Sequence, residues 1–264
     1  MSKQFCYTVD DNIRFLKELS EGSYKSLFDH PYLAMYRRLH EAYGLRVQLN
    51  LFYRCQGFDL SAMTDRFREE WAANAHWLKL SFHSKEESPR PYEASGYDEV
   101  YADCAAVHRE ICRFAGEKSL ASSTTVHFCL ATDEGIRALY DNGVRGLLGL
   151  YGADQRPNRS YRSTEEECMR LREGETVTSG DIAYGGIDII LNAYDTDTIV
   201  ARLSAITDRP LIKVMIHEQY FYPDYPRYQA EFESKLDATF SRLAAGGYAS
   251  CFFEETYKTI GEQI

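Results

Sequence analysis

The sequence has fewer basic than acidic residues, and it has no long apolar segment. These two absences argue against a nucleic-acid partner and against a membrane span. Lys and Arg total 30 against 40 for Asp and Glu, which gives a net charge of -10. Such a chain does not attract the polyanionic backbone of nucleic acid, so we expect no nucleic-acid partner. No window approaches the roughly 18 consecutive apolar residues of a membrane span. The start, MSKQFCYTVDDN, has no charged segment followed by an apolar one, so we expect a cytoplasmic protein with no membrane partner.

Cysteine pairs and nucleotide-binding glycines are also missing. The seven cysteines are odd in number and scattered, and no CxxC pair occurs. This pattern is not that of a disulfide framework or a structural zinc knuckle, so we expect reduced cysteines in the core. The glycine segments GVRGLLG and YGG lack the spacing of a phosphate loop or dinucleotide fingerprint, and no nucleotide cofactor is expected.

What the sequence does contain is a regular alternation of strand and helix patterns. Its 264 residues, 44% of them hydrophobic, are enough for one large core. Short β-branched or aromatic runs predict strands at residues 5–9, 45–53, 76–84, 123–131, 144–151, 182–194, 210–218 and 248–254. Helical patterns lie between them at 12–21, 31–44, 64–75, 97–115, 132–142, 196–206 and 227–245. We therefore predict an α/β fold, a single (β/α) barrel domain over residues 1–264, with a polar insertion around 153–180 that carries a short helix.

Acidic residues and histidines follow several of the predicted strands. Asp10 and Asp11 end the first strand, His83 ends the third, His127 lies in or near the end of the fourth, and His217 ends the strand 210–218. In a (β/α) barrel the carboxyl ends of the strands meet on the face that carries the reactive groups. The sequence therefore predicts a reactive centre made from these side chains.

Simpler roles compete for each of these residues. The simpler role for Asp10 or Asp11 is that of an N-cap for the helix that follows, although two adjacent carboxylates after a buried strand repel each other unless a cation or a proton relieves the repulsion. His83 is either structural or a ligand, and one helical turn would bring Glu87 to its side. His127 either is buried and inert or points into the barrel mouth, since strand residues alternate in direction.

The last histidine has the stronger case for proton transfer. His217 is followed by Glu218, which could orient its ring. The tyrosine-rich segment 220–228 comes next and could line a sugar-binding wall or cover the rim of the core.

These segments resemble the motifs of the NodB-like polysaccharide deacetylases, also called carbohydrate esterase family four. The family motif Thr-Phe-Asp-Asp is matched by TVDD, which ends at Asp11. The motif His-Ser/Thr-x-x-His is half matched by HSKEE, which begins at His83 and has Glu87 where the second histidine would stand. The resemblance implies a distorted (β/α)7-type, TIM-like barrel, with Asp10 as general base and Asp11 and His83 as metal ligands.

The remaining assignments from the resemblance are less direct. Either Glu87 or His127 would supply the third metal ligand, and the arginine of the family's third motif is missing near His127. The late histidine motif is matched by IHE, which implies that His217 is the general acid that protonates the leaving amine.

The resemblance implies a metal-dependent hydrolase that removes an N-acetyl or other acyl group from a sugar or sugar-containing metabolite. Its cofactor would be a divalent metal, with zinc expected, and its partner a small-molecule or oligosaccharide substrate. Two alternatives stand beside it: a metal-free amide hydrolase on the same barrel, and a non-catalytic carbohydrate-binding protein, since the second histidine and the arginine are absent. The sequence indicates no particular oligomeric state.

Overall fold

Parallel strands arranged as a distorted barrel form the centre of the computed structural model, which describes residues 3–87, 90, 92–161 and 163–257. The strands are β1 (Gln4–Asn12), β2 (Val47–Cys55), β3 (Phe58–Asp59), β4 (Leu78–Glu86), β5 (Ser123–Thr124), β6 (Gly146–Gly149), β7 (Thr176–Ser179), β8 (Ile182–Gly186), β9 (Ile189–Ile190), β10 (Leu211–His217) and β11 (Ala249–Cys251). The α-helices are α1 (Arg14–Glu21), α2 (Pro31–Tyr43), α3 (Arg68–Asn74), α4 (Tyr97–Phe114), α5 (Asp133–Asp141), α6 (Glu165–Arg172), α7 (Thr196–Ala205), α8 (Phe232–Ala245) and α9 (Phe253–Tyr257).

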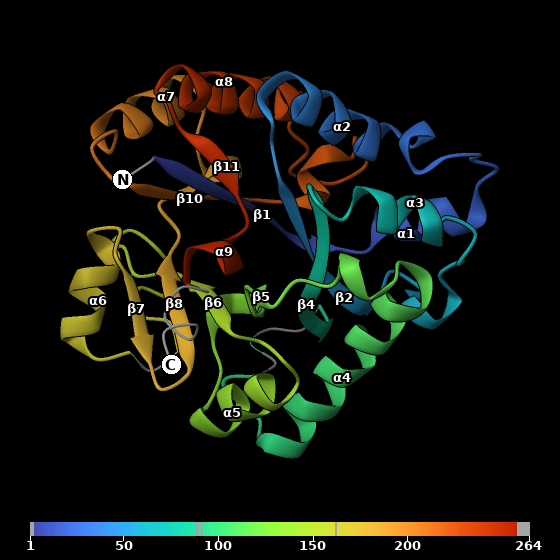
Figure 1. Cartoon of the computed structure of the whole chain (residues 1–264), viewed down its shortest axis with the longest axis horizontal. Coiled ribbons are helices and arrows are strands. Elements are labelled where there is room, and N and C mark those ends of the chain that lie inside the picture. Colours follow the sequence, from blue (N-terminus) through green and yellow to red (C-terminus); the bar gives the residue numbers. More distant parts are fainter. Residues whose placement is uncertain (1–2, 88–89, 91, 162, 258–264) are drawn as a thin grey trace.

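The parallel strands form two sheets, in the order β4, β2, β1, β10, β9 in one and β5, β6, β8 in the other. β4 and β5 lie side by side, where Ser81 Oγ donates to the carbonyl oxygen of Ser123 at 2.6 Å. β8 pairs with β6 and the adjoining β9 pairs with β10, so this one segment joins the two sheets. Helices α2, α7 and α8 form a row along the strands β1 and β10, and α4 and α5 lie at the opposite side of the molecule (Figure 1). The predicted (β/α)7-type barrel is confirmed.

The first strand shows how the alternation of side chains builds both the core and the barrel interior. Phe5 and Tyr7 face outward and pack on Phe240 of α8, with ring centroids 5.6 and 4.9 Å apart. The hydroxyl of Tyr7 lies 3.0 Å from that of Tyr36 in α2. Because strand side chains alternate, the other face of β1, which ends at Asp10, looks into the barrel.

The barrel interior is polar below the carboxyl ends of the strands. Asn50 Nδ2 donates to Asp10 Oδ1 at 2.7 Å, and Gln48 Nε2 donates both to Asn50 Oδ1 at 2.8 Å and to the carbonyl of Ser123 at 3.0 Å. All four residues are buried. Buried polar groups need such partners, so this chain of hydrogen bonds fixes the position of the Asp10 carboxyl group.

The fourth predicted strand is much shorter than the sequence pattern indicated. Only Ser123 and Thr124 pair as β5, and the following residues turn into a 3-10 segment, His127–Cys129. Phe128 and Cys129 both have positive φ, at 59° and 54°. The prediction of a strand over 123–131 is wrong because the chain turns sharply here instead of remaining extended, and this turn carries His127.

The final predicted strand and the polar segment also differ in detail from the expectation. β11 pairs with the first residues of β1, where Gln4 aligns with Ala249, instead of adding a barrel position. The segment 153–180 contains α6, as the sequence predicted, and also β7, which pairs antiparallel with β8. Among the helices of the described residues, none has the length and apolarity that a membrane span requires.

Candidate active site

Two β-bulges place ligand-type side chains at the carboxyl ends of β1 and β4. The pairing of β1 with β2 shifts register between Val9 and Asn12, and Asp11 within this bulge has a φ of 62°. The pairing of β2 with β4 shifts beside His83. A bulge redirects a side chain that strict alternation would point elsewhere, so Asp11 can face the same side as Asp10.

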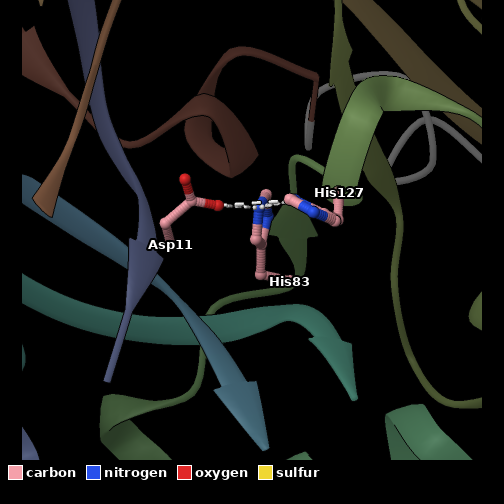
Figure 2. A group of neighbouring side chains, drawn as sticks. All are labelled: Asp11, His83 and His127. Atoms are coloured by element: carbon pink, nitrogen blue, oxygen red, sulfur yellow. Dashed lines mark hydrogen bonds and ion pairs between the residues drawn. The ribbon is translucent and has the colours of Figure 1, made fainter. Parts of the chain in front are cut away.

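Asp11, His83 and His127 come together although they are far apart in the sequence (Figure 2). His83 Nε2 lies 3.0 Å from Asp11 Oδ1 and 3.1 Å from His127 Nδ1, and His127 Nδ1 lies 3.4 Å from Asp11 Oδ1. The two rings are buried. One oxygen and two nitrogens that converge in this way could hold a divalent metal ion.

The surroundings of the cluster fix how its donors point. His83 Nδ1 donates to the carbonyl oxygen of Thr125, which leaves the lone pair of Nε2 facing Asp11 and His127. The second oxygen of Asp11 accepts a hydrogen bond from Gln219 Nε2 at 2.7 Å. Hydrogen bonds of this kind hold metal-binding histidines and carboxylates in the tautomer and orientation that a metal needs, so the residues present fit a metal ion.

The protonation states of Asp11 and His83 also suit metal binding. Burial alone would raise the pKa of Asp11, but the neighbouring imidazole groups of His127, His83 and His217 outweigh it and hold this pKa well below its usual value. Burial lowers the pKa of His83, although Asp11 acts in the opposite direction. The carboxylate is therefore ionised and the His83 ring neutral near pH 7, as metal binding requires.

Glu87, the rival candidate for third ligand, lies apart from this cluster. β4 continues to Glu86, so the chain after His83 is extended instead of helical, and residues four apart are not neighbours in a strand. Glu87 is exposed, and its Oε2 lies 3.5 Å from Cys55 Sγ. The expected helical turn between His83 and Glu87 is thus wrong, and the structure groups His127 with Asp11 and His83 in its place.

A second pair of groups lies beside the cluster. Asp10 and His217 are aligned partners in the parallel pairing of β1 with β10. His217 Nδ1 lies 2.9 Å from Asn192 Oδ1, and a hydrogen bond donated there leaves Nε2 free to act. Burial raises the pKa of Asp10 well above its usual value, and Asp11 raises it further, against the effect of Asn50. Burial lowers the pKa of His217, while Asp11 raises it.

Glu218 does not orient His217, as the sequence suggested. Its buried carboxylate accepts hydrogen bonds from the backbone N–H groups of Ile13, Arg14 and Phe15, at 2.7 to 3.1 Å, and from the hydroxyl of Tyr222 at 2.9 Å. Burial raises the pKa of Glu218 to about 7 despite these four bonds. Glu218 therefore joins the end of β10 to the start of α1 and holds the β1 end of the site in place.

We expect Glu218→Gln to destabilise the fold by about 1–3 kcal/mol at pH 8, where the carboxylate is ionised. The amide nitrogen would face backbone N–H donors and leave at least one of them without an acceptor. Urea unfolding followed by circular dichroism measures this change. Tyr222→Phe, which removes one of the four bonds, should cost less, and equal stability of Glu218→Gln and the wild type would contradict the assigned role.

The candidate metal ligands and the pair Asp10 and His217 line the same cavity, which has a volume of about 520 Å³. The cavity is lined by Asp10, Asp11, His83, His127 and His217, and also by Glu87, Phe128, Arg156, Gln219, Tyr220 and Arg227. This volume is in the range of small-molecule sites, and the polar groups lie together on its walls. Sequence reasoning missed Asn50, Asn192 and Gln219. The rule of strand ends would have indicated Asn192, which follows β9, whereas Asn50 lies in the middle of β2.

Comparison with known proteins gives matches only at the level of structure. No family model matches the chain, and no curated protein matches it. The 4-α-glucanotransferase of Thermococcus litoralis is similar over 97% of this chain, at 12% identity and a TM-score of 0.63. The likeness shows the fold alone. This chain spans 40% of the length of the glucanotransferase chain that it matches.

Carbohydrate esterases of family four are also among the structures that match. The Xyl-CE4 domain of a multidomain xylanase from the hindgut metagenome of Trinervitermes trinervoides matches over 98% of this chain and 91% of its own, at 11% identity and a TM-score of 0.48. A family 4 acetyl xylan esterase from Clostridium thermocellum, solved in complex with a cobalt ion, matches over 97% and 91%, at 13% identity and a TM-score of 0.46.

Proposed function

We propose that this chain is a metal-dependent hydrolase that removes an N-acetyl or other acyl group from a sugar or sugar-containing metabolite. The observation that carries the proposal is the meeting of two sets of groups in one cavity: the cluster Asp11, His83 and His127, and the aligned pair Asp10 and His217. A ligand set beside an acid–base pair suits metal-assisted hydrolysis of an acyl bond.

Asp11, His83 and His127 would hold the metal, and their nitrogen and oxygen donors suit zinc. When bound, a divalent metal polarises the acyl carbonyl and lowers the pKa of water. Thr125 orients His83 and Gln219 orients Asp11 before metal binding, so these two ligands need little reorganisation.

Asp10 and His217 would carry the protons. Asp10, held by Asn50, takes a proton from the attacking water, and its raised pKa makes it a better base than an exposed aspartate. His217, oriented by Asn192, donates a proton to the leaving nitrogen or oxygen when it is in the imidazolium form. The exposed ring of Phe128 and that of Tyr220 line the same cavity and offer faces on which a sugar can stack.

Zinc-loaded protein should release acetate from at least one member of a panel of N- and O-acetylated sugars. Treatment with a chelator should abolish the release, and added zinc should restore it, because the acyl carbonyl loses its polarising cation. Acetate measured by an enzyme-coupled assay gives the result. Release that resists the chelator would favour metal-free hydrolysis, and sugar binding without release would favour a binding protein.

A further inference from the structure

Two arginines line the cavity of the candidate site and have no carboxylate partner among the residues that the structure describes. Arg156 lies in the segment between β6 and α6, and Arg227 lies between β10 and α8. Within the described residues, Arg156 Nη1 donates to the carbonyl oxygens of Ala153 and Gln155, at 3.3 and 2.7 Å. For Arg227 no acceptor is found among the residues that the structure describes. Both guanidinium groups thus keep N–H donors for another partner.

The carboxylates of the same cavity are already engaged. Asp10 accepts from Asn50, and Asp11 interacts with His83, His127 and Gln219. The remaining one, Glu87, contacts the thiol of Cys55. None of the described contacts joins these acids to the two arginines.

The other arginines around the neighbouring cavities behave differently. Arg156 also lines one of these cavities, but each of the remaining arginines there pairs with a carboxylate: Arg14 with Asp224, Arg172 with Glu165, Arg202 with Asp154 and Arg209 with Asp188. The chain has ten more acidic than basic residues, 40 against 30, so carboxylate partners are abundant. In the described part of the chain, Arg156 and Arg227 have no such partner. Both lie on the wall of the cavity that holds the reactive groups, where they are placed to bind an anion from outside the chain.

We propose that the substrate is an anionic sugar derivative, and that Arg156 and Arg227 bind its carboxylate or phosphate. This inference rests on the proposed function for the identity of the site. Planar guanidinium groups form paired, charge-assisted hydrogen bonds with both kinds of oxyanion. They also offset the repulsion that an anion meets on approaching a chain with a net charge of -10.

Calorimetric titration of the zinc-loaded protein tests the proposal with sugars that carry no acyl group, so that binding is measured without turnover. The probes are glucose, glucose 1-phosphate, glucose 6-phosphate and glucuronate, which share one ring and differ in the anion and its position. We expect at least one anionic probe to bind about tenfold or more tightly than glucose, as one charge-assisted hydrogen bond allows. The preferred probe distinguishes phosphate from carboxylate.

In the double variant Arg156→Gln with Arg227→Gln, the advantage of the anionic probe should disappear while glucose binding is unchanged. Arg137→Gln is the matched control, because Arg137 is 79% exposed and pairs with Asp141 away from this cavity. Anion binding to the metal itself would survive in the double variant and would overturn the proposal. Equal binding of all probes by the wild type would also overturn it, and so would a double variant that loses affinity equally for glucose and for the anionic probes. If the protein released acetate from none of the acylated sugars, the proposed hydrolase activity would be contradicted. The titrations would still test anion binding, because they do not depend on turnover.

Discussion

Replacing His127 with alanine should remove the metal from the protein, whereas replacing Glu87 with glutamine should leave it bound. His127 Nδ1 lies 3.4 Å from Asp11 Oδ1 and 3.1 Å from His83 Nε2, so its loss leaves two ligands of three. Even groups that only orient metal ligands contribute about 10- to 100-fold to affinity, and loss of a ligand should cost at least about 100-fold. Hydrolytic activity should disappear with the metal.

Elemental mass spectrometry of dialysed protein gives the bound metal per chain. Wild type and Glu87→Gln should hold about one ion, and His127→Ala should hold close to none. His83→Ala should also lose the metal, but this change removes the hydrogen bond to Thr125 as well, so His127→Ala is the cleaner test. Metal retained in His127→Ala and lost in Glu87→Gln would reverse the assignment of the third ligand.

The sequence predicted the barrel because its hydrophobic patterns are strong and regular. The helix 31–44 begins at a proline and ends at Gly44, which adopts a left-handed φ of 64°, and the structure places α2 there. Such local signals depend on neighbouring residues, so they can be interpreted without the fold. The confirmed architecture in turn explains why Asp10 and His217 are aligned: their strands are adjacent and parallel.

The position of the third metal-type ligand could not be predicted, because it depends on irregular backbone. The spacing of His83 and Glu87 suggested a helical turn, yet β4 remains extended to Glu86. The segment around His127 has the apolar composition of a strand, but the positive φ of Phe128 turns it toward the site. A turn stabilised by contacts with distant residues leaves little trace in local sequence.

The partners that orient the reactive groups were missed for a related reason. Asn192 and Gln219 act on His217 and Asp11 from other elements, and neither has a distinctive local motif. Glu218 was assigned to the neighbouring histidine because it is adjacent in sequence, but β10 ends at His217 and Glu218 begins a 3-10 segment that turns away from the strand. Its carboxylate instead meets the N-terminus of α1.

Replacing Asp10 with asparagine should abolish turnover while the protein stays folded and keeps its metal. Asparagine preserves the size of the side chain, and its amide oxygen can still accept the hydrogen bond from Asn50. The variant cannot take a proton from water, and a positioned general base contributes about 10²- to 10⁴-fold to rate. Acetate release at saturating substrate measures the loss, and metal analysis of the same sample shows whether the cluster at Asp11 is intact.

The stability of this variant separates a catalytic aspartate from a structural one. Burial raises the pKa of Asp10 well above its value of 3.8 in the unfolded chain, with a smaller contribution from Asp11 in the same direction. A carboxyl group of this kind favours folding below pH 3.8, and that stability is lost as the pH rises through the folded pKa. At pH 8 the metal-free Asp10→Asn protein should therefore unfold at the same urea concentration as the wild type or a higher one. A lower midpoint together with retained activity would show that Asp10 supports the barrel and that another group acts as the base.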